Sequence, residues 1–272
     1  MDYVSFPNLG ITLNLNKIAI NLGFITIYWY ALIIVAGIIL GYLLACKIAR
    51  KEDISADTMS DVLLYALPSA VICARIYYVA FNFSQYKDNF WDAFKINQGG
   101  IAIYGAIIGA LISTYIYAKI KKIPFLKIFD IGAYGLLVGQ AVGRWGNFVN
   151  QEAYGGITFN LFAMRGNIIN EYLDMHSAAL DTMGVHPTFL YESIWNILGL
   201  ILLLAIYKLK TKDGQMFFSY VLWYGFGRFF IEGLRTDSLM LGAFRVSQLL
   251  AAVSVVFSII ILIILRRGKQ DE

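Results

Sequence analysis

The chain of 272 residues is 59% hydrophobic and only 15% charged, and its mean hydropathy is +0.65. Soluble domains are about 45–50% apolar and about 25% charged, so this composition excludes an ordinary soluble domain and predicts an integral membrane protein. The net charge of +4 is modest and its basic residues are scattered in short clusters, which argues against a nucleic-acid partner. The two cysteines, Cys46 and Cys73, both lie in apolar runs and are expected to pack there rather than form a disulfide framework.

Seven runs are long and apolar enough to cross a membrane, which takes about 20 residues per helix. They cover approximately residues 18–46, 62–83, 99–118, 123–143, 187–207, 214–231 and 246–265. The second run is interrupted by Pro68 and Arg75, and the fourth and sixth have the shortest uncharged cores. The sequence therefore predicts an all-α membrane protein with seven transmembrane helices in a single polytopic domain, residues 1–272.

Lysines and arginines follow the first, third, fifth and seventh runs, on one side of a seven-span arrangement. They are Lys47, Arg50, Lys51, Lys119, Lys121, Lys122, Lys127, Lys208, Lys210, Lys212, Arg266, Arg267 and Lys269. Because cytoplasmic loops are enriched in these residues, we expect an extracytoplasmic N-terminus and a cytoplasmic C-terminus. Residues 145–186, between the fourth and fifth spans, then form a small extracytoplasmic head.

Four further arginines fall within or at the outer ends of the predicted spans: Arg75, Arg144, Arg228 and Arg235. A single arginine in such a place is usually a snorkelling side chain or half of an internal salt bridge. Four at one level of the membrane favour a site for an anionic lipid, because ionisable groups are costly there.

The end of the sixth span places charged side chains on one helical face. Tyr224, Arg228 and Glu232 are four residues apart and Arg235 is three further on. A guanidinium group matches a phosphate in a bidentate way, and Glu232 can hold an arginine in that orientation. The alternative is an Arg228–Glu232 pair that only neutralises itself.

Polar residues after Arg144 and before the fifth span leave two interpretations open. Asn147 and Asn150, followed by Glu152, either cap the helix end or hydrogen-bond glycerol hydroxyls and ester oxygens. His186, with an ordinary pKa near 6.5, is either a general base or a structural link to Glu192 or a backbone carbonyl.

The stretch Gly143–Gly155, GRWGNFVNQEAYG, resembles the signature of the prolipoprotein diacylglyceryl transferase family, and the resemblance extends over essentially the whole chain. Its other matching residues are Tyr30, Arg75, Gly99, Gly100, Asp130, His186, Pro187, Leu190, Tyr191, Glu192, Tyr224, Gly225, Arg228, Glu232 and Arg235. The resemblance implies an enzyme of the bacterial inner membrane that transfers the diacylglyceryl group of phosphatidylglycerol to a cysteine thiol. The acceptor is the lipobox cysteine of a prolipoprotein signal peptide, and the products are a thioether and glycerol 1-phosphate.

The resemblance also implies a role for each matching polar residue in a site at the outer leaflet. Arg144 and Arg228 are expected to stabilise the leaving phosphate, with Arg235 and Glu232 as support. The headgroup is expected to be oriented by Tyr30, Asn147, Glu152 and Tyr224, and Gly155 is expected to leave room for it. We expect no cofactor and no metal, since no His/Cys cluster has ligand spacing, and we expect a monomer.

Tyr104 is a departure from the family, because many members have a histidine at this position. The ordinary pKa of tyrosine is about 10, so Tyr104 is a poor base at neutral pH. Tyr104, His186 and Glu152, in that order, are the candidates for accepting the thiol proton.

Two other classes of protein would also place arginines in a helix bundle. A transporter of anions or lipids would be expected to show paired inverted repeats, which the sequence lacks. A non-catalytic lipid-binding scaffold would not explain so many polar residues at one outer level.

Overall fold

The computed structural model describes residues 2–23, 25–87, 89–95, 99–176 and 182–267 and is mostly helical. Its α-helices are α1 (Trp29–Lys51), α2 (Ala56–Phe81), α3 (Ile103–Lys121), α4 (Phe125–Asn150), α5 (Asn167–Met175), α6 (Thr188–Ile206), α7 (Gln215–Leu234) and α8 (Val246–Arg267). Its strands are β1 (Asp2–Phe6), β2 (Ile11–Leu15), β3 (Ile18–Asn21), β4 (Thr26–Tyr28), β5 (Ile157–Thr158), β6 (Arg165–Gly166), β7 (Gly184–Val185), β8 (Met240–Leu241) and β9 (Phe244–Arg245). Short 3-10 helices are η1 (Pro7–Leu9), η2 (Phe83–Tyr86), η3 (Phe90–Phe94) and η5 (Tyr207–Leu209).

Each predicted span coincides with a long helix. Within the described residues, 6 helices are long and apolar enough to cross a membrane, namely α1, α2, α3, α4, α6 and α8. The remaining long helix, α7, has 20 residues at the predicted place but carries Arg228 and Glu232. The membrane character is therefore confirmed, whereas the total of seven spans and their orientation stay predictions.

The first helix differs most from its predicted range of 18–46. Residues Ile18–Asn21 and Thr26–Tyr28 pair as the hairpin β3–β4, and α1 starts only at Trp29. The Asn21 side chain accepts a hydrogen bond from the Gly23 amide at 3.0 Å, and Gly23 has φ +84°. A turn of this kind ends β3, and the apolar pattern of the sequence alone does not reveal the turn.

Two other helices are longer and more regular than expected. Helix α2 passes through Pro68 and Arg75 without a break. In membrane helices, neighbouring groups can hydrogen-bond the backbone carbonyl that loses its donor to a proline. Helix α4 continues to Asn150, so the head begins after that residue rather than at Trp145.

Two compact units make up the chain: unit 1 comprises residues 1–44 and 132–272, and unit 2 comprises residues 45–131. In unit 1, glycines allow α1 and α4 to pack closely. A Cβ atom on Gly41 would lie 2.6 Å from the Gly135 carbonyl oxygen, and one on Gly37 would lie 3.3 Å from that of Gly139. Small residues at such positions are typical of packed membrane helices.

Helices α6 and α7 of unit 1 are joined by a reciprocal pair of tryptophans. Trp195 Nε1 donates to the Trp223 carbonyl and Trp223 Nε1 donates to the Trp195 carbonyl, both at 2.9 Å. The two rings stack with centroids 4.3 Å apart. Gly199 and Gly227 lie against these rings, where a Cβ atom would collide with them. This contact fixes the register of the two helices that carry Glu192 and Arg228.

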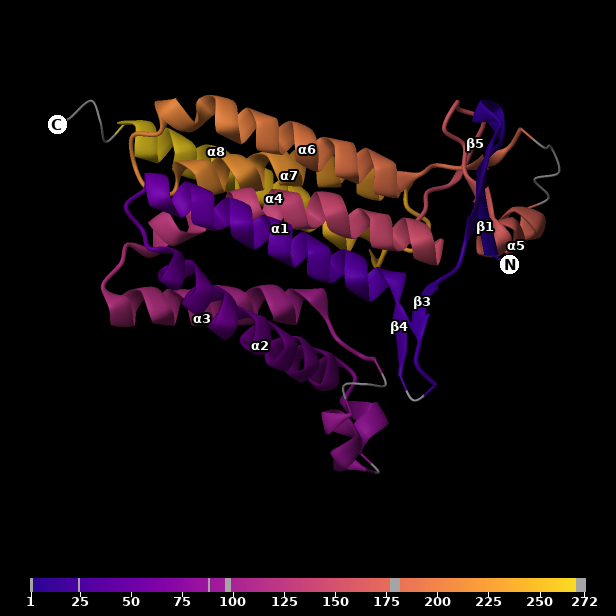
Figure 1. Cartoon of the computed structure of the whole chain (residues 1–272), viewed down its shortest axis with the longest axis horizontal. Helices are drawn as coiled ribbons and strands as arrows, with labels where there is room; N and C mark the ends of the chain where they lie inside the picture. The colour runs from indigo at the N-terminus through magenta and orange to yellow at the C-terminus, as the bar shows by residue number, and fades with distance from the viewer. Residues whose placement is uncertain (1, 24, 88, 96–98, 177–181, 268–272) are drawn as a thin grey trace. The chain divides into compact units, whose positions relative to one another are not determined.

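The head of unit 1 is built from the N-terminal strands and the segment after α4. Strands form a sheet in the order β2-β1-β6, and β5 pairs with β7. Beneath them lies a cluster of buried apolar residues: Val4, Phe148, Met164, Ile169, Leu173, Val185 and Phe189. In Figure 1, β1, β5 and α5 lie beyond one end of α4 and α6, whereas α6 and α8 finish at the opposite end. Phe148 thus ties the end of α4 to the head.

In unit 2, α2 and α3 pack against each other through glycines of α3. A Cβ atom on Gly105 would lie 2.6 Å from Tyr77 Cβ, and one on Gly109 would lie 2.7 Å from Cys73 Cβ. The chain between these helices carries η2 and η3.

Candidate active site

Glu192, near the start of α6, is the carboxylate at which three arginines meet. Arg144 Nη2 lies 2.5 Å from Glu192 Oε2, and Arg228 Nη1 lies 3.0 Å from Glu192 Oε1. Arg235 Nη1 lies 3.9 Å from the same Oε1 atom. Glu192 is only 3% exposed, so a single buried carboxylate organises arginines from α4, α7 and the segment after α7.

A second buried carboxylate, Glu232 of α7, completes this cluster. Arg228 Nη2 lies 2.5 Å from Glu232 Oε2, and Arg235 Nε lies 3.9 Å from the same atom. Arg245 donates from Nη1 to the Glu232 backbone carbonyl at 2.6 Å. Arg228 and Glu232 share a face of α7, with Tyr224 one turn earlier, as predicted, whereas α7 ends at Leu234 and Arg235 approaches Glu232 from just beyond the helix. We call Arg144, Arg228, Arg235, Glu192 and Glu232 the arginine cluster.

The edge of the arginine cluster is closed by Asp237. Arg235 donates from Nε and Nη2 to the two oxygens of Asp237, at 2.9 and 2.8 Å. Burial on its own would raise the pKa of Asp237, but the hydrogen bonds and charge of Arg235 hold that pKa below its usual value. Burial likewise works to lower the pKa of Arg235, and Asp237 followed by Glu192 and Glu232 raises it overall. Both partners are therefore ionised at neutral pH.

Charge and exposure within the arginine cluster favour an anionic ligand. The side chains of Arg144, Arg228 and Arg235 are 20%, 16% and 13% exposed, against 4% and 2% for the two glutamates. Three guanidinium groups thus face two buried carboxylates and are the more accessible part. Arginines held in this way present an oriented set of donors that matches a phosphate.

The end of α4 extends the cluster through a chain of side-chain hydrogen bonds. Arg144 Nη1 donates to Asn147 Oδ1 at 3.3 Å, and Asn147 Nδ2 donates to Glu152 Oε1 at 2.8 Å. Asn150 Nδ2 lies 3.4 Å from the same Glu152 oxygen. Both amides therefore hold the Glu152 carboxylate, and hydrogen bonds from the asparagines to glycerol hydroxyls and ester oxygens stay a prediction.

The two tyrosines expected to orient a headgroup, Tyr30 and Tyr224, lie beside the signature and the arginine cluster respectively. The Tyr30 ring packs on Gly146 of the signature, where a Cβ atom would lie 2.7 Å from Tyr30 Cδ2. Tyr224 lies one helical turn before Arg228, and its ring stacks on Tyr220 with centroids 5.9 Å apart. The structure therefore brings Tyr30 and Tyr224 to the faces of unit 1 that carry the signature and the arginine cluster.

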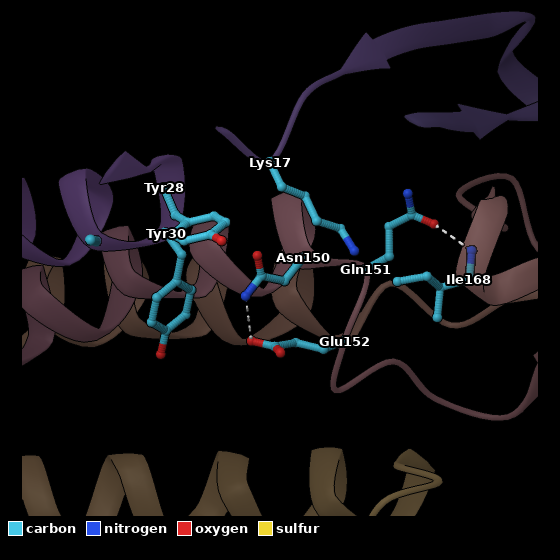
Figure 2. Close-up of a pocket in the computed structure, with 8 residues that line it drawn as sticks. Lys17, Tyr28, Tyr30, Asn150, Gln151, Glu152 and Ile168 are labelled. Atoms are coloured by element: carbon cyan, nitrogen blue, oxygen red, sulfur yellow. Dashed lines mark hydrogen bonds between the residues drawn. The ribbon is translucent and has the colours of Figure 1, made fainter. Parts of the chain in front are cut away.

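A pocket of about 550 Å³ opens beside the end of α4. Figure 2 shows its lining: Lys17, Tyr28, Tyr30, Ala31, Asn150, Gln151, Glu152 and Ile168. Tyr30, Asn150 and Glu152 connect this pocket to the signature.

His186 and Gly155 have mainly structural surroundings. His186 Nδ1 lies 3.2 Å from the Tyr191 hydroxyl and 3.4 Å from Asn160 Nδ2, and burial lowers the pKa of His186. Its partners are thus Tyr191 and Asn160 rather than Glu192. A Cβ atom on Gly155 would lie 2.7 Å from His186 Cβ and 3.0 Å from the Leu234 carbonyl oxygen. The space that Gly155 leaves is therefore filled by the chain itself.

Arg75 and Tyr104 both belong to unit 2. Arg75 donates from Nε to the Ala93 carbonyl at 2.7 Å, from Nη1 to the carbonyls of Gly99 and Gly100 at 2.7 and 2.8 Å, and from Nη2 to the Asp92 carbonyl at 2.8 Å. Arg75 therefore fixes the segment between α2 and α3, unlike the three arginines of the arginine cluster. Tyr104 begins α3 and its ring lies 6.5 Å from that of Tyr77.

Sequence reasoning missed the central place of Glu192 and the contribution of Asp237. From the sequence, Glu192 is named as a partner of His186 and as one of the residues that carry the family resemblance, and Asp237 is not named. A signal for Glu192 existed, because a carboxylate inside an apolar span requires a cationic partner. Asp237 lies in an ordinary polar loop and gave none.

The apolar helices indicate a membrane protein, and its arginine cluster has the chemistry that suits an anionic group. A family model described as prolipoprotein diacylglyceryl transferase matches residues 17–264. The chain belongs to this family and is a membrane transferase of lipoprotein biosynthesis.

Relatives named phosphatidylglycerol–prolipoprotein diacylglyceryl transferase are similar over nearly the whole chain. The protein of Listeria innocua is 48% identical over 257 residues, covering 94% of this chain and 92% of the relative. That of Bacillus cytotoxicus is 45% identical over 264 residues, covering 97% of each chain. A Bacillus cereus relative is 44% identical over 265 residues, again covering 97% of each chain.

Proposed function

We propose that this protein transfers the diacylglyceryl group of phosphatidylglycerol to the lipobox cysteine of prolipoproteins. The sulfur forms a bond to the carbon of the diacylglycerol that carries the phosphate. The bond between that carbon and its phosphate oxygen breaks. The electron pair leaves on the oxygen, so the products are a thioether and glycerol 1-phosphate. The thiol proton passes to a base, since the thiolate is the nucleophile.

The observation that carries this proposal is the meeting of three arginines on Glu192. A leaving phosphate monoester gains negative charge in the transition state, and preorganised donors aimed at that charge supply a large part of catalysis. Arg144 and Arg228 are the residues that we assign to the phosphate. Glu192 and Glu232 hold their guanidinium groups in place before the lipid arrives, and Arg235 adds charge at the edge.

Tyr30, Asn147, Glu152 and Tyr224 are proposed to orient the headgroup around the phosphate. The hydrogen-bond chain from Arg144 through Asn147 to Glu152 supports this assignment. Holding the lipid and the thiol in line avoids much of the entropic cost of a reaction between two molecules.

The proton acceptor is proposed to be Tyr104, with His186 and Glu152 as the next candidates. His186 is neutral at pH 7, but its Nδ1 atom faces Tyr191 and Asn160. Glu152 already accepts hydrogen bonds from the amides of Asn147 and Asn150.

We propose that the protein is a monomer that spans the bacterial plasma membrane seven times, with its N-terminus outside and its C-terminus in the cytoplasm. The active site then lies at the outer leaflet. The positions of the basic residues support this orientation, because Lys208 of η5, directly after α6, and Arg266 and Arg267 of α8 follow the ends of these helices away from the head (Figure 1).

The test is a transfer assay with purified protein in detergent. Phosphatidylglycerol is supplied with a lipobox peptide or with the same peptide carrying serine in place of cysteine, and glycerol phosphate release is followed. We expect release only with the cysteine peptide. A folded protein that binds phosphatidylglycerol but releases nothing would instead be a lipid-binding scaffold.

A further inference from the structure

The pocket beside α4 contains two opposite charges that do not neutralise each other. Lys17 and Glu152 both line it (Figure 2). Among the described residues neither side chain forms an ion pair, and Lys17 has no side-chain hydrogen bond. The half-buried ammonium group of Lys17 thus has no partner among these residues, and a carboxylate lines the same pocket. This arrangement indicates a ligand that hydrogen-bonds to both groups.

Lys17 is held at the base of the hairpin β3–β4. Its backbone carbonyl accepts a hydrogen bond from the Trp29 amide at 3.0 Å. On its other side, the Asn16 side chain accepts from the Ile18 amide at 2.9 Å, and Ile18 pairs with Tyr28. In Figure 2 the Lys17 side chain extends from the loop before β3 toward Gln151 at the end of α4. These hydrogen bonds hold the Lys17 backbone in the position from which its ammonium group reaches the pocket.

Glu152 is held even more firmly, by an unusual backbone on both sides. Gln151 and Ala153 have φ of +54° and +57°, in the left-handed region that residues other than glycine rarely adopt. Gln151 donates from Nε2 to the Tyr3 carbonyl at 3.1 Å and accepts from the Ile168 amide at 3.1 Å. Such a conformation persists only where surrounding contacts enforce it, and here it turns Glu152 toward the pocket.

The pocket is linked to the arginine cluster by a single intervening side chain. Asn147 accepts from Arg144 and donates to Glu152, at 3.3 and 2.8 Å. A small group attached to a phosphate bound by Arg144 would therefore reach this pocket.

We propose that Lys17 makes the pocket a subsite for the free hydroxyls of a glycerol phosphate headgroup, and that it selects this headgroup against those bearing an ammonium group. The inference rests on the proposed function and adds to it a specificity-determining residue. A hydroxyl can donate to Glu152 and accept from Lys17, so a neutral diol satisfies both. An ammonium headgroup satisfies Glu152 but is repelled by Lys17, and a carboxylate headgroup meets the reverse problem.

The first experiment compares two inhibitors of the transfer reaction, glycerol 1-phosphate and n-propyl phosphate, which lacks the hydroxyls. Hydrogen bonds to charged groups change affinity by roughly tenfold or more, so the wild-type protein should bind glycerol 1-phosphate about tenfold better. Lys17→Met should remove most of that preference and leave inhibition by propyl phosphate unchanged. Lys17→Arg should retain it, and Lys87→Met, a matched change of an exposed lysine elsewhere, should not alter either inhibitor.

The second experiment uses the lipid in place of the product. Lys17→Met should raise KM for phosphatidylglycerol several-fold with kcat nearly unchanged, and should make phosphatidylethanolamine a better competitor than it is for the wild type. An unchanged preference in Lys17→Met, or equal losses for both phosphates, would overturn the subsite. If the wild type catalyses no transfer, the proposed function fails, and direct calorimetric binding of the same two phosphates still decides the role of Lys17.

Discussion

Arg75 in unit 2 and Arg228 in unit 1 are both charged residues inside long, mostly apolar helices, but they have different partners. Within the part of the chain that the structure describes, Arg75 donates to backbone carbonyls, those of Asp92, Ala93, Gly99 and Gly100. Arg228 instead lies between two carboxylates, Glu192 and Glu232.

This difference separates a structural arginine from one that we propose to bind the phosphate. Carbonyls carry no net charge, and they take four of the five N–H donors of Arg75, so little of its guanidinium is left for a ligand. Glu192 and Glu232 are shared among three arginines, and Asp237 pairs with Arg235. The guanidinium groups of Arg144 and Arg228 remain more exposed than the two glutamates, so their donors stay accessible to a ligand. Position in the membrane alone had placed Arg75 and Arg228 in one group.

The comparison is tested most severely by Arg144→Ala and Arg228→Ala. Each removes donors from the leaving phosphate, and losing one such donor typically costs about 100-fold or more in kcat. We expect each variant to lose at least that much activity while its level in the membrane stays normal. The measurement is the cysteine-dependent release of glycerol phosphate.

Arg266→Ala, at the end of α8, serves as the control for a lost surface arginine and should be fully active. Full activity in Arg144→Ala or Arg228→Ala would remove the phosphate assignment.

Substitutions of Tyr104 test whether unit 2 takes part in the reaction as well as in the structure. General base catalysis is worth about 100-fold or more, so Tyr104→Phe should lower kcat by roughly that factor and change KM little. Tyr104→His should retain activity, with a loss at low pH as the imidazole is protonated below about pH 6.5.

Tyr65→Phe, a change of an exposed tyrosine on α2, is the matched control. Should Tyr104→Phe remain as active as this control, proton removal would belong to His186 or Glu152.

Arg75→Lys sharpens the comparison from the structural side. Lysine lacks the planar fork that reaches four carbonyls, and the expected loss is about 2 kcal/mol in the free energy of unfolding. KM for phosphatidylglycerol should stay unchanged. The measurements are thermal unfolding in detergent and steady-state kinetics, with Arg50→Lys as the control. A raised KM with unchanged stability would contradict a purely structural Arg75.

The helices were predictable from the sequence because long apolar runs have few alternatives to a membrane helix. The strands were not, since β1 pairs with β6, more than 150 residues away, and no local pattern encodes that partner. The shared face of Arg228 and Glu232 followed from helical spacing alone. Glu192 could not be placed with them because α6 and α7 meet through Trp195 and Trp223, a tertiary contact.

The smallest expected effect concerns His186, which lies beside the site without belonging to the arginine cluster. Burial lowers the pKa of His186 below the ordinary value of 6.5, so the unfolded chain binds the proton more readily than the folded one. The stability associated with neutral His186 is therefore complete above about pH 6.5 and declines as the pH falls through the lower folded-state pKa. His186→Gln should flatten this part of the stability profile between about pH 7 and 5, whereas His176→Gln, a change of the exposed histidine after α5, should not. Thermal unfolding of the three proteins across this range measures the difference, and parallel profiles for all three would mean that His186 is not a buried neutral group. Since His186 touches Tyr191 and Asn160 rather than the arginines, the same substitution should alter KM for phosphatidylglycerol far less than Arg144→Ala does.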